Sequence, residues 1–164
     1  MMYRVLFICT ANICRSPLAE VILQKKIDDA GLSGQMEAAS CGLLAMDGQE
    51  ACHASVEVAA ENEIDLSRHR STSITAQDLR LSNLILTMTP DHRDEILYYH
   101  SATVDNVYTL KGYLRKIPPV NEAIDDPYGL TLNFYRRIYK EIEDEISRIF
   151  PKLVKNAQKS IPGG

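Results

Sequence analysis

A cysteine and an arginine that could act together lie near the start of the chain, in the stretch VLFICTANICRSPLAE at residues 5–20. A cysteine thiolate is a strong nucleophile, and the planar guanidinium of arginine can bind two phosphate oxygens at once. Cys9 ends an apolar run, and Ser16-Pro17 directly follows Arg15, an order typical of a helix start. Backbone N–H groups at a helix start attract anions, so a thiol there is expected to ionise near neutral pH. The stretch therefore predicts a nucleophile, an anion-binding loop and a guanidinium at one site.

The same residues also have a purely structural interpretation. A cysteine at the end of an apolar strand is more often a packed small side chain than a nucleophile. The spacing C-x-x-x-x-x-R alone is a weak pattern, because it often arises by chance. The context favours chemistry, since an apolar strand precedes Cys9, a helix start follows Arg15, and Asn12 inside the loop tolerates unusual backbone angles. We therefore interpret Cys9 as a catalytic residue.

Short β-rich runs alternate with longer helical patterns along the 164 residues, which is typical of an α/β domain with a parallel sheet. Strands are expected at residues 3–8, 36–39, 84–88 and 104–110. Helices are expected at residues 17–31 with Ser16 as N-cap, at 51–61, after the capping box of Thr75, after Thr89-Pro90, and from residue 133 onward. The last helix carries one apolar stripe, formed by Tyr135, Ile138, Ile142, Ile146 and Ile149.

These elements predict a doubly wound sheet of four parallel strands with helices on both faces. In such a sheet ligands bind beyond the carboxyl ends of the strands, which is where the loop after Cys9 must lie. We expect one domain over residues 1–155, because a chain of this length suits a single core. A flexible tail is expected at residues 156–164, beyond Pro151, where the sequence ends in SIPGG.

A second motif, DDPYG at residues 125–129, follows the fourth expected strand. Together with VLFICTANICRSPLAE it resembles the signatures of the low-molecular-weight protein tyrosine phosphatases, and the resemblance covers nearly the whole chain. The resemblance implies a flavodoxin-like three-layer α/β sandwich with a four-stranded parallel sheet. It also implies an enzyme that hydrolyses phosphotyrosine on proteins through a cysteinyl-phosphate intermediate, with no cofactor and no metal.

The resemblance also assigns roles by position. It makes Cys9 the nucleophile, Arg15 the ligand of the phosphoryl oxygens, and Asp126 the general acid and then the general base. Ser16 would hydrogen-bond the thiolate. Apart from these assignments, Tyr128 is expected to contact the substrate, and substrate choice is expected to depend on Tyr128 and on the loop of residues 43–51. The phosphate-binding loop would consist of Cys9, Thr10, Ala11, Asn12, Ile13, Cys14, Arg15 and Ser16, supported by hydrogen bonds of Ser40 and His69.

One position of this loop departs from the family. Ala11 stands where relatives usually have glycine. If the position needs a positive φ, alanine would be strained there, because glycine has no Cβ to clash in that region. The departure concerns the geometry of the loop and leaves its chemistry intact.

Asp126 also has a chemical argument of its own. Breaking the phosphorus–oxygen bond of phosphotyrosine releases a phenolate whose conjugate acid has a pKa of about 10, so proton donation to that oxygen is valuable at neutral pH. Paired aspartates before a proline are more commonly a solvated turn. The long loop after the fourth strand lies at the same sheet edge as Cys9, which favours catalysis by Asp126, with Asp125 as the alternative acid.

Three other functions fit parts of the pattern. Protein-arginine phosphatases resemble the chain on the same scaffold, but they carry threonine where this sequence has Ile13, and a bulky aliphatic side chain favours a planar aromatic substrate. Arsenate reductases need further cysteines to relay a disulfide, and none follows Cys52. A non-catalytic phosphate-binding module would not need both a thiol and an aspartate.

None of the four cysteines forms a C-x-x-C pair, so they are expected as free thiols in the reducing cytoplasm and not as metal ligands. Cys14 could be a packed thiol or, as in relatives with both loop cysteines, could trap oxidised Cys9 in a reversible disulfide. The net charge of −4 gives no reason to expect nucleic acid as a partner, and no apolar stretch is long enough to enter a membrane. Surface positions without a role are expected for His53, His92 and His100.

Overall fold

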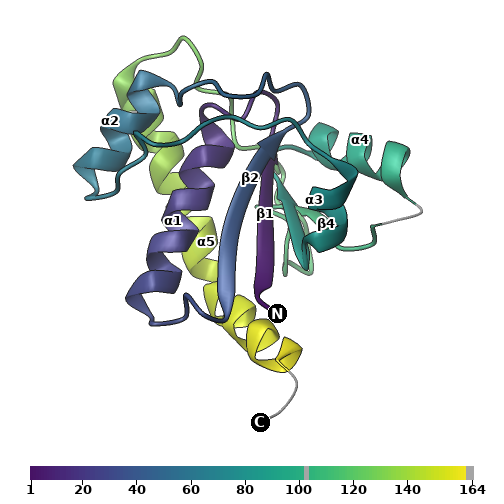
Figure 1. The fold of residues 1–164 in the computed structure, drawn as a ribbon. Coiled ribbons are helices and arrows are strands. Elements are labelled where there is room, and N and C mark those ends of the chain that lie inside the picture. The colour runs from purple at the N-terminus through teal and green to yellow at the C-terminus, as the bar shows by residue number, and fades with distance from the viewer. Residues whose placement is uncertain (102–103, 162–164) are drawn as a thin grey trace.

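The computed structural model describes residues 1–101 and 104–161 (Figure 1). In this part of the chain, one parallel sheet has the strand order β2-β1-β3-β4. The strands are β1 (Tyr3–Cys9), β2 (Met36–Gly42), β3 (Leu84–Thr87) and β4 (Val107–Thr109). The helices are α1 (Arg15–Asp29), α2 (His53–Glu61), α3 (Ala76–Leu81), α4 (Pro90–His100) and α5 (Leu132–Ser160).

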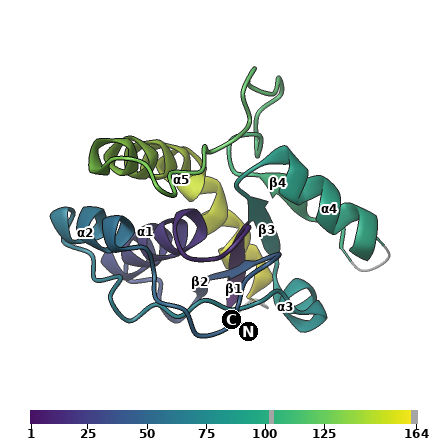
Figure 2. The same cartoon turned by 90° about the horizontal axis from the view of Figure 1, so that it is seen from above.

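Helices cover both faces of the sheet, with α1, α2 and α5 on one side and α3 and α4 on the other (Figure 2). The side chains of β1 alternate between two cores, as the pleat of a strand requires. Val5 and Phe7 belong to the larger core under α1 and α5, whereas Leu6 and Ile8 belong to the smaller core under α3 and α4. This arrangement confirms the predicted α/β sandwich with four parallel strands.

Two of the predicted helix starts are confirmed, and one is wrong. Thr75 forms the predicted capping box with Asp78, and the Thr89 hydroxyl accepts a hydrogen bond from the backbone N–H of His92. At α1, however, the N-cap is Cys14, and Ser16 lies buried in the first turn of the helix. The physical reason is that the Ser16 hydroxyl is bonded to side chains of the preceding loop and is not available to cap the helix.

The C-terminal helix α5 extends beyond its predicted end. All residues of its predicted apolar stripe are buried, and Leu153 and Ala157 continue the stripe past Pro151. A proline inside a helix costs about 3 kcal/mol, and the burial of a leucine side chain returns about 1.5–3 kcal/mol. Residues 156–160 of the expected tail are therefore helical, whereas residues 162–164 lie outside the described residues.

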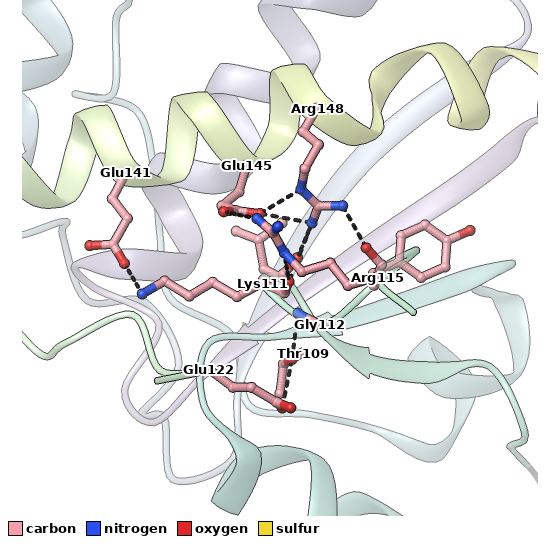
Figure 3. Close-up of polar contacts among 10 residues, drawn as sticks. Thr109, Lys111, Gly112, Arg115, Glu122, Glu141, Glu145 and Arg148 are labelled. Atoms are coloured by element: carbon pink, nitrogen blue, oxygen red, sulfur yellow. Dashed lines mark hydrogen bonds and ion pairs between the residues drawn. The ribbon is translucent and has the colours of Figure 1, made fainter. Parts of the chain in front are cut away.

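Arg148 of α5 fixes the turn that follows β4 (Figure 3). Its side chain pairs with Glu145 at 2.7 Å, and Glu145 also pairs with Arg115 of the turn at 2.8 Å. The guanidinium donates hydrogen bonds to three backbone oxygens of the turn, those of Leu110, Lys111 and Tyr113. One side chain thus supplies donors to three carbonyls of the turn, and the carbonyl of Lys111 also accepts a hydrogen bond from Arg115 Nε at 2.7 Å.

Glu122 fixes the other end of the same segment. Its carboxylate accepts a hydrogen bond from Thr109 Oγ1 at 3.1 Å (Figure 3) and pairs with Arg93 of α4 at 3.1 Å. The hydroxyl of Thr109 in turn accepts a hydrogen bond from the backbone N–H of Gly112 at 2.9 Å. These contacts hold the chain between β4 and α5 against the sheet, so that the DDPYG loop starts from a defined position.

Candidate active site

The two sequence motifs meet at the carboxyl edge of the sheet. Cys9 ends β1 between the neighbouring strands β2 and β3, and the chain then crosses residues 10–14 to enter α1. A cavity of about 310 Å³ lies there. Its lining residues come from both motifs: Cys9, Thr10, Ala11, Ile13, Cys14, Arg15, Asp126 and Tyr128. The position agrees with the general rule that parallel sheets bind ligands where the strand order reverses.

The Cys9 thiol is surrounded by hydrogen-bond donors. Its Sγ lies 2.9 Å from the hydroxyl oxygen of Ser16 and accepts a hydrogen bond from the backbone N–H of Asn12 at 3.3 Å. The side chain is almost fully buried, and its contact with Ser16 brings it close to the first turn of α1. Both donors and the positive end of the helix dipole stabilise negative charge on the sulfur.

The left-handed backbone position of the loop falls on Asn12 and not on Ala11. Asn12 has a φ of 57°, whereas Ala11 is not among the described non-glycine residues with positive φ. Asparagine adopts this region more readily than other non-glycine residues. The strain that alanine would cause at Ala11 therefore does not arise.

The side chain of Asn12 is fully buried and holds the loop to three separate parts of the chain. Its amide nitrogen donates to Ser16 Oγ at 2.8 Å and to Ser40 Oγ at 2.9 Å, and its amide oxygen accepts from the backbone N–H of Thr72 at 3.0 Å. Its backbone oxygen accepts a hydrogen bond from His69 Nε2 at 2.7 Å. Ser40 and His69 thus both hydrogen-bond to Asn12, a residue of the loop that they are expected to support.

Two titratable groups behind the loop are shifted toward their neutral forms. Burial lowers the pKa of His69, and the hydrogen bond that its Nε2–H donates to the Asn12 oxygen opposes this shift. The hydroxyl of Ser40 donates to the carboxylate of Glu20, and burial raises the pKa of Glu20 despite this bond. No motif or spacing in the sequence marks Glu20 as a member of this network.

Arg15 is buried at the base of the cavity. Its Nη1 donates a hydrogen bond to the backbone oxygen of Ile124 at 2.9 Å, and its Nη2 lies 3.9 Å from Asp126 Oδ2. A guanidinium has five N–H donors, so most of them remain for an anion in the cavity that Arg15 lines. The bond to Ile124 also joins the first motif to the segment that carries the second.

Asp126 lines the cavity, and its neighbour Asp125 does not. The Asp126 carboxylate accepts a hydrogen bond from the backbone N–H of Tyr128 at 3.1 Å, while its side chain remains 58% exposed. Both aspartates are exposed, so exposure does not distinguish them; the ion pair with Arg15 does. Tyr128 is largely exposed at the mouth of the same cavity.

His92 is a residue for which the sequence analysis was wrong. It is buried, and its Nε2 lies 2.9 Å from the Thr10 hydroxyl oxygen. Its Nδ1 has no hydrogen-bond partner among the described residues. Burial, helped by the nearby Arg15 charge, lowers the pKa of His92 to about 4. The available signal was its place in the first turn of a helix that starts at the carboxyl end of β3.

Gly42, at the end of β2, is a second residue that pattern reasoning missed. A Cβ at this position would lie 2.6 Å from the backbone oxygen of Thr10 and 2.9 Å from Ala45 Cβ. The next two residues pack as closely, because Leu43 donates its N–H to the Cys9 oxygen and Leu44 donates to the Thr10 oxygen. Glycine is thus required for close approach of two backbones, a need that the sequence does not reveal.

The expectation of four free thiols is wrong for two of them. The structure joins Cys14 and Cys52 in a disulfide with a Cα–Cα distance of 5.5 Å, whereas Cys9 and Cys41 are free. The physical reason is that the loop before α2 folds against the phosphate loop, so two cysteines far apart in the sequence come together. Cys41 is buried, and burial raises its pKa to about 12.

Within residues 1–101 and 104–161, no group of three or more histidine, cysteine, aspartate or glutamate side chains could hold a metal ion. Over the same residues, no helix combines the length and the apolar character that crossing a membrane requires.

Comparison with known proteins identifies similar chains over nearly the whole length. A family model for low molecular weight phosphotyrosine protein phosphatases matches residues 4–159. A protein-arginine-phosphatase of Geobacillus stearothermophilus is 34% identical over 153 residues, covering 93% of this chain and 97% of that protein. The low molecular weight protein-tyrosine-phosphatase PtpB of Staphylococcus epidermidis is 32% identical over 147 residues, covering 89% and 96%. A solved structure of a low molecular weight protein tyrosine phosphatase from T. tengcongensis matches with a TM-score of 0.83 and 34% identity, covering 92% and 99%.

Proposed function

This chain belongs to the low molecular weight phosphotyrosine protein phosphatase family, and we propose that it hydrolyses phosphotyrosine on proteins with Cys9 as the nucleophile. The observation that carries the proposal is that one cavity is lined by a thiol, a guanidinium and a carboxylate: those of Cys9, Arg15 and Asp126. Each supplies a different part of a phosphoryl transfer, and the first two lie far from the third in the sequence.

In the first step, Arg15 and the N–H groups of the phosphate loop bind the phosphoryl oxygens, and the Cys9 thiolate attacks the phosphorus. The buried guanidinium is already fixed by Ile124, so little order is lost when the anion binds. As the sulfur–phosphorus bond forms, the bond to the tyrosine oxygen breaks. Asp126 donates its proton to that oxygen, so that a neutral phenol leaves and a cysteinyl-phosphate remains.

In the second step, the Asp126 carboxylate takes a proton from water, and the water oxygen attacks the phosphorus. The sulfur–phosphorus bond breaks and the Cys9 thiolate leaves. The Ser16 hydroxyl, 2.9 Å from Sγ, and the Asn12 N–H, 3.3 Å from it, are placed to stabilise the departing thiolate. The mechanism thus uses side chains, backbone N–H groups and water, and Cys9 is regenerated for the next substrate.

A second candidate function is hydrolysis of phosphoarginine on proteins. It is favoured by the 34% identity to a protein-arginine-phosphatase. Against it stands Ile13, which lines the cavity and packs on the larger core. An aliphatic wall suits the flat face of a phenyl ring, whereas it offers no hydrogen-bond acceptor to a phosphoguanidinium group. We therefore place phosphotyrosine first.

The deciding experiment measures kcat/KM on peptides that carry phosphotyrosine, phosphoserine or phosphoarginine at the same position. We expect phosphotyrosine to be hydrolysed best, and Ile13→Thr to move the preference toward phosphoarginine. Val120→Thr makes a similar change on the exposed surface, away from the cavity, and should leave the preference unchanged. If the wild-type enzyme prefers phosphoarginine, hydrolysis of phosphoarginine replaces hydrolysis of phosphotyrosine as the proposed function. No hydrolysis of any peptide would contradict both.

The proposal also includes the surroundings of the enzyme. Its substrates are phosphoproteins, and we infer a cytoplasmic location, because the mechanism requires Cys9 as a free thiol and the cytoplasm keeps thiols reduced. Fractionation of cells followed by immunodetection tests this inference. Recovery of the protein outside the cytoplasmic fraction would contradict it.

A further inference from the structure

The disulfide between Cys14 and Cys52 places a third sulfur next to the catalytic loop. Cys14 lines the same cavity as Cys9, and its sulfur is bonded to that of Cys52. Cys9 itself is free in this same structure. The oxidised pair is therefore one that leaves the nucleophile unmodified.

We propose that Cys52 is a resolving thiol that transfers oxidation away from Cys9, so that peroxide ends in the Cys14–Cys52 disulfide and the nucleophile is restored. The inference rests on the proposed function in that it takes Cys9 to be the reactive thiolate. It assigns to Cys52, which has no part in phosphate binding, a role in redox chemistry.

The two thiols stay together even when the disulfide is reduced. Cys52 donates its backbone N–H to the oxygen of Ile13 at 2.8 Å, and the Ser55 hydroxyl donates to the oxygen of Cys14 at 3.3 Å. These hydrogen bonds dock the start of α2 on the phosphate loop independently of the sulfurs. A reduced Cys52 thiol thus remains within reach of Cys14.

Both half-cystines are the N-cap residues of helices, Cys14 of α1 and Cys52 of α2. The positive end of a helix dipole favours the thiolate, which is the attacking form in disulfide exchange. Cys14 is buried, whereas Cys52 is half-buried. Cys52 is therefore the more exposed residue of the pair, and we expect an external dithiol reductant to attack there.

The chemistry proceeds in three balanced steps. The Cys9 thiolate attacks hydrogen peroxide, the oxygen–oxygen bond breaks, and a sulfenic acid and hydroxide form. The Cys14 thiolate attacks the Cys9 sulfur, a sulfur–sulfur bond forms, and hydroxide leaves. The Cys52 thiolate then attacks the Cys14 sulfur, and the electron pair of the broken bond returns to Cys9. One peroxide and two thiol protons become two waters, and two thiols become one disulfide.

The surroundings of Cys9 favour the last step. In disulfide exchange the better-stabilised thiolate leaves faster. The Cys9 sulfur has the Ser16 hydroxyl and the Asn12 N–H to stabilise its charge when it departs. The same donors that serve the phosphoenzyme step would thus release Cys9 from the Cys9–Cys14 disulfide.

The test starts from fully reduced protein and adds one equivalent of hydrogen peroxide. The reaction is then quenched with iodoacetamide, and the peptides are mapped by mass spectrometry without reduction. We expect wild type to show linked Cys14 and Cys52, alkylated Cys9, and most of its phosphatase activity. Cys52→Ser should instead show linked Cys9 and Cys14 and lose most of its activity until dithiothreitol is added. Serine is a favourable N-cap, so this variant keeps the start of α2.

Two further variants make the test specific. Cys41→Ala removes the buried thiol that the relay does not use and should behave as wild type. Cys9→Ser should form the Cys14–Cys52 disulfide much more slowly, because the oxidation must pass through Cys9. The proposal is overturned if wild type accumulates the Cys9–Cys14 disulfide. It is also overturned if Cys9→Ser forms the Cys14–Cys52 disulfide as fast as wild type. Because the sulfurs are mapped without turnover, the relay can fail or hold separately from the phosphatase function.

Discussion

Mild acidification should destabilise the protein, and replacing His92 by glutamine should make this loss of stability much smaller. The imidazole is buried beside the phosphate loop, and its Nε2 lies 2.9 Å from Thr10 Oγ1. Burial is the main cause that lowers the pKa of His92 from 6.5 to about 4. The charge of Arg15 lowers it further, while the carboxylates of Asp91 and Asp126 oppose the shift.

The direction of the effect follows from proton binding. The folded protein binds a proton at His92 less tightly than the unfolded chain, so unfolding takes up a proton at pH values between 4 and 6.5. The stabilisation is complete above pH 6.5 and is lost as the pH falls toward 4. Each pH unit in this window corresponds to about 1.4 kcal/mol, so acidification to about pH 5 should cost about 2 kcal/mol through His92.

The assay is urea unfolding under reducing conditions at about pH 7 and about pH 5, followed by circular dichroism. Glutamine at position 92 can still hydrogen-bond Thr10 but does not titrate, so His92→Gln should lose about 2 kcal/mol less than wild type. His53 is exposed on α2, and His53→Gln should keep the wild-type pH dependence. The shifted groups Glu20 and His69 are present in all three proteins, so their contributions cancel in the comparison.

An equal loss of stability in wild type and His92→Gln would refute the reasoning. It would mean that the ring is not kept neutral by its burial in the folded protein. If His53→Gln also lost about 2 kcal/mol less stability than wild type on acidification, the result would point instead to a general effect of histidine replacement.

Three further predictions concern the site. Cys9→Ser should abolish turnover while orthophosphate still binds in calorimetry; substantial remaining activity would exclude Cys9 as nucleophile. Asp126→Asn should lower kcat/KM on phenyl phosphate by about 100-fold or more, and less on aryl phosphates with good leaving groups; if Asp125→Asn shows this leaving-group dependence instead, the acid is Asp125. Gly42→Ala should cost about 1–3 kcal/mol in urea unfolding, because its Cβ meets a backbone oxygen of the phosphate loop at 2.6 Å, whereas Gly34→Ala, with nothing within 4 Å, should be close to neutral.

Features that depend on local pattern could be predicted from the sequence. The almost uniformly apolar run of β1 indicated a central strand, and Thr75 and Thr89 indicated helix starts, because strand burial and helix capping involve neighbouring residues. The cavity could be anticipated as well, since parallel strands bring Cys9 and the loop of Asp126 to one edge.

Features that depend on contact between distant segments could not be predicted. Cys52 is paired with Cys14 only because the loop before α2 folds onto the phosphate loop. His92 is buried only because α4 turns its first residues toward Thr10. Gly42 has an ordinary backbone conformation. Glycine is required there because a Cβ would meet the backbone oxygen of Thr10, just after the end of β1. In each case the contact is made with a residue far away in the sequence, and neither residue spacing nor structural propensity predicts such a contact.

The hydrogen bonds of Asn12 make the site depend on a segment with no regular structure of its own. Two of its contacts, from His69 Nε2 and the Thr72 N–H, come from residues 69–72, which lie between α2 and α3. Proteins open locally at a lower free energy than they unfold globally, and segments outside helices and strands open first. Opening of residues 69–72 would remove these two hydrogen bonds of Asn12 while the sheet stays intact. Turnover would then fall at a lower temperature or denaturant concentration than the circular dichroism signal, and catalysis would report on the local stability of residues 69–72.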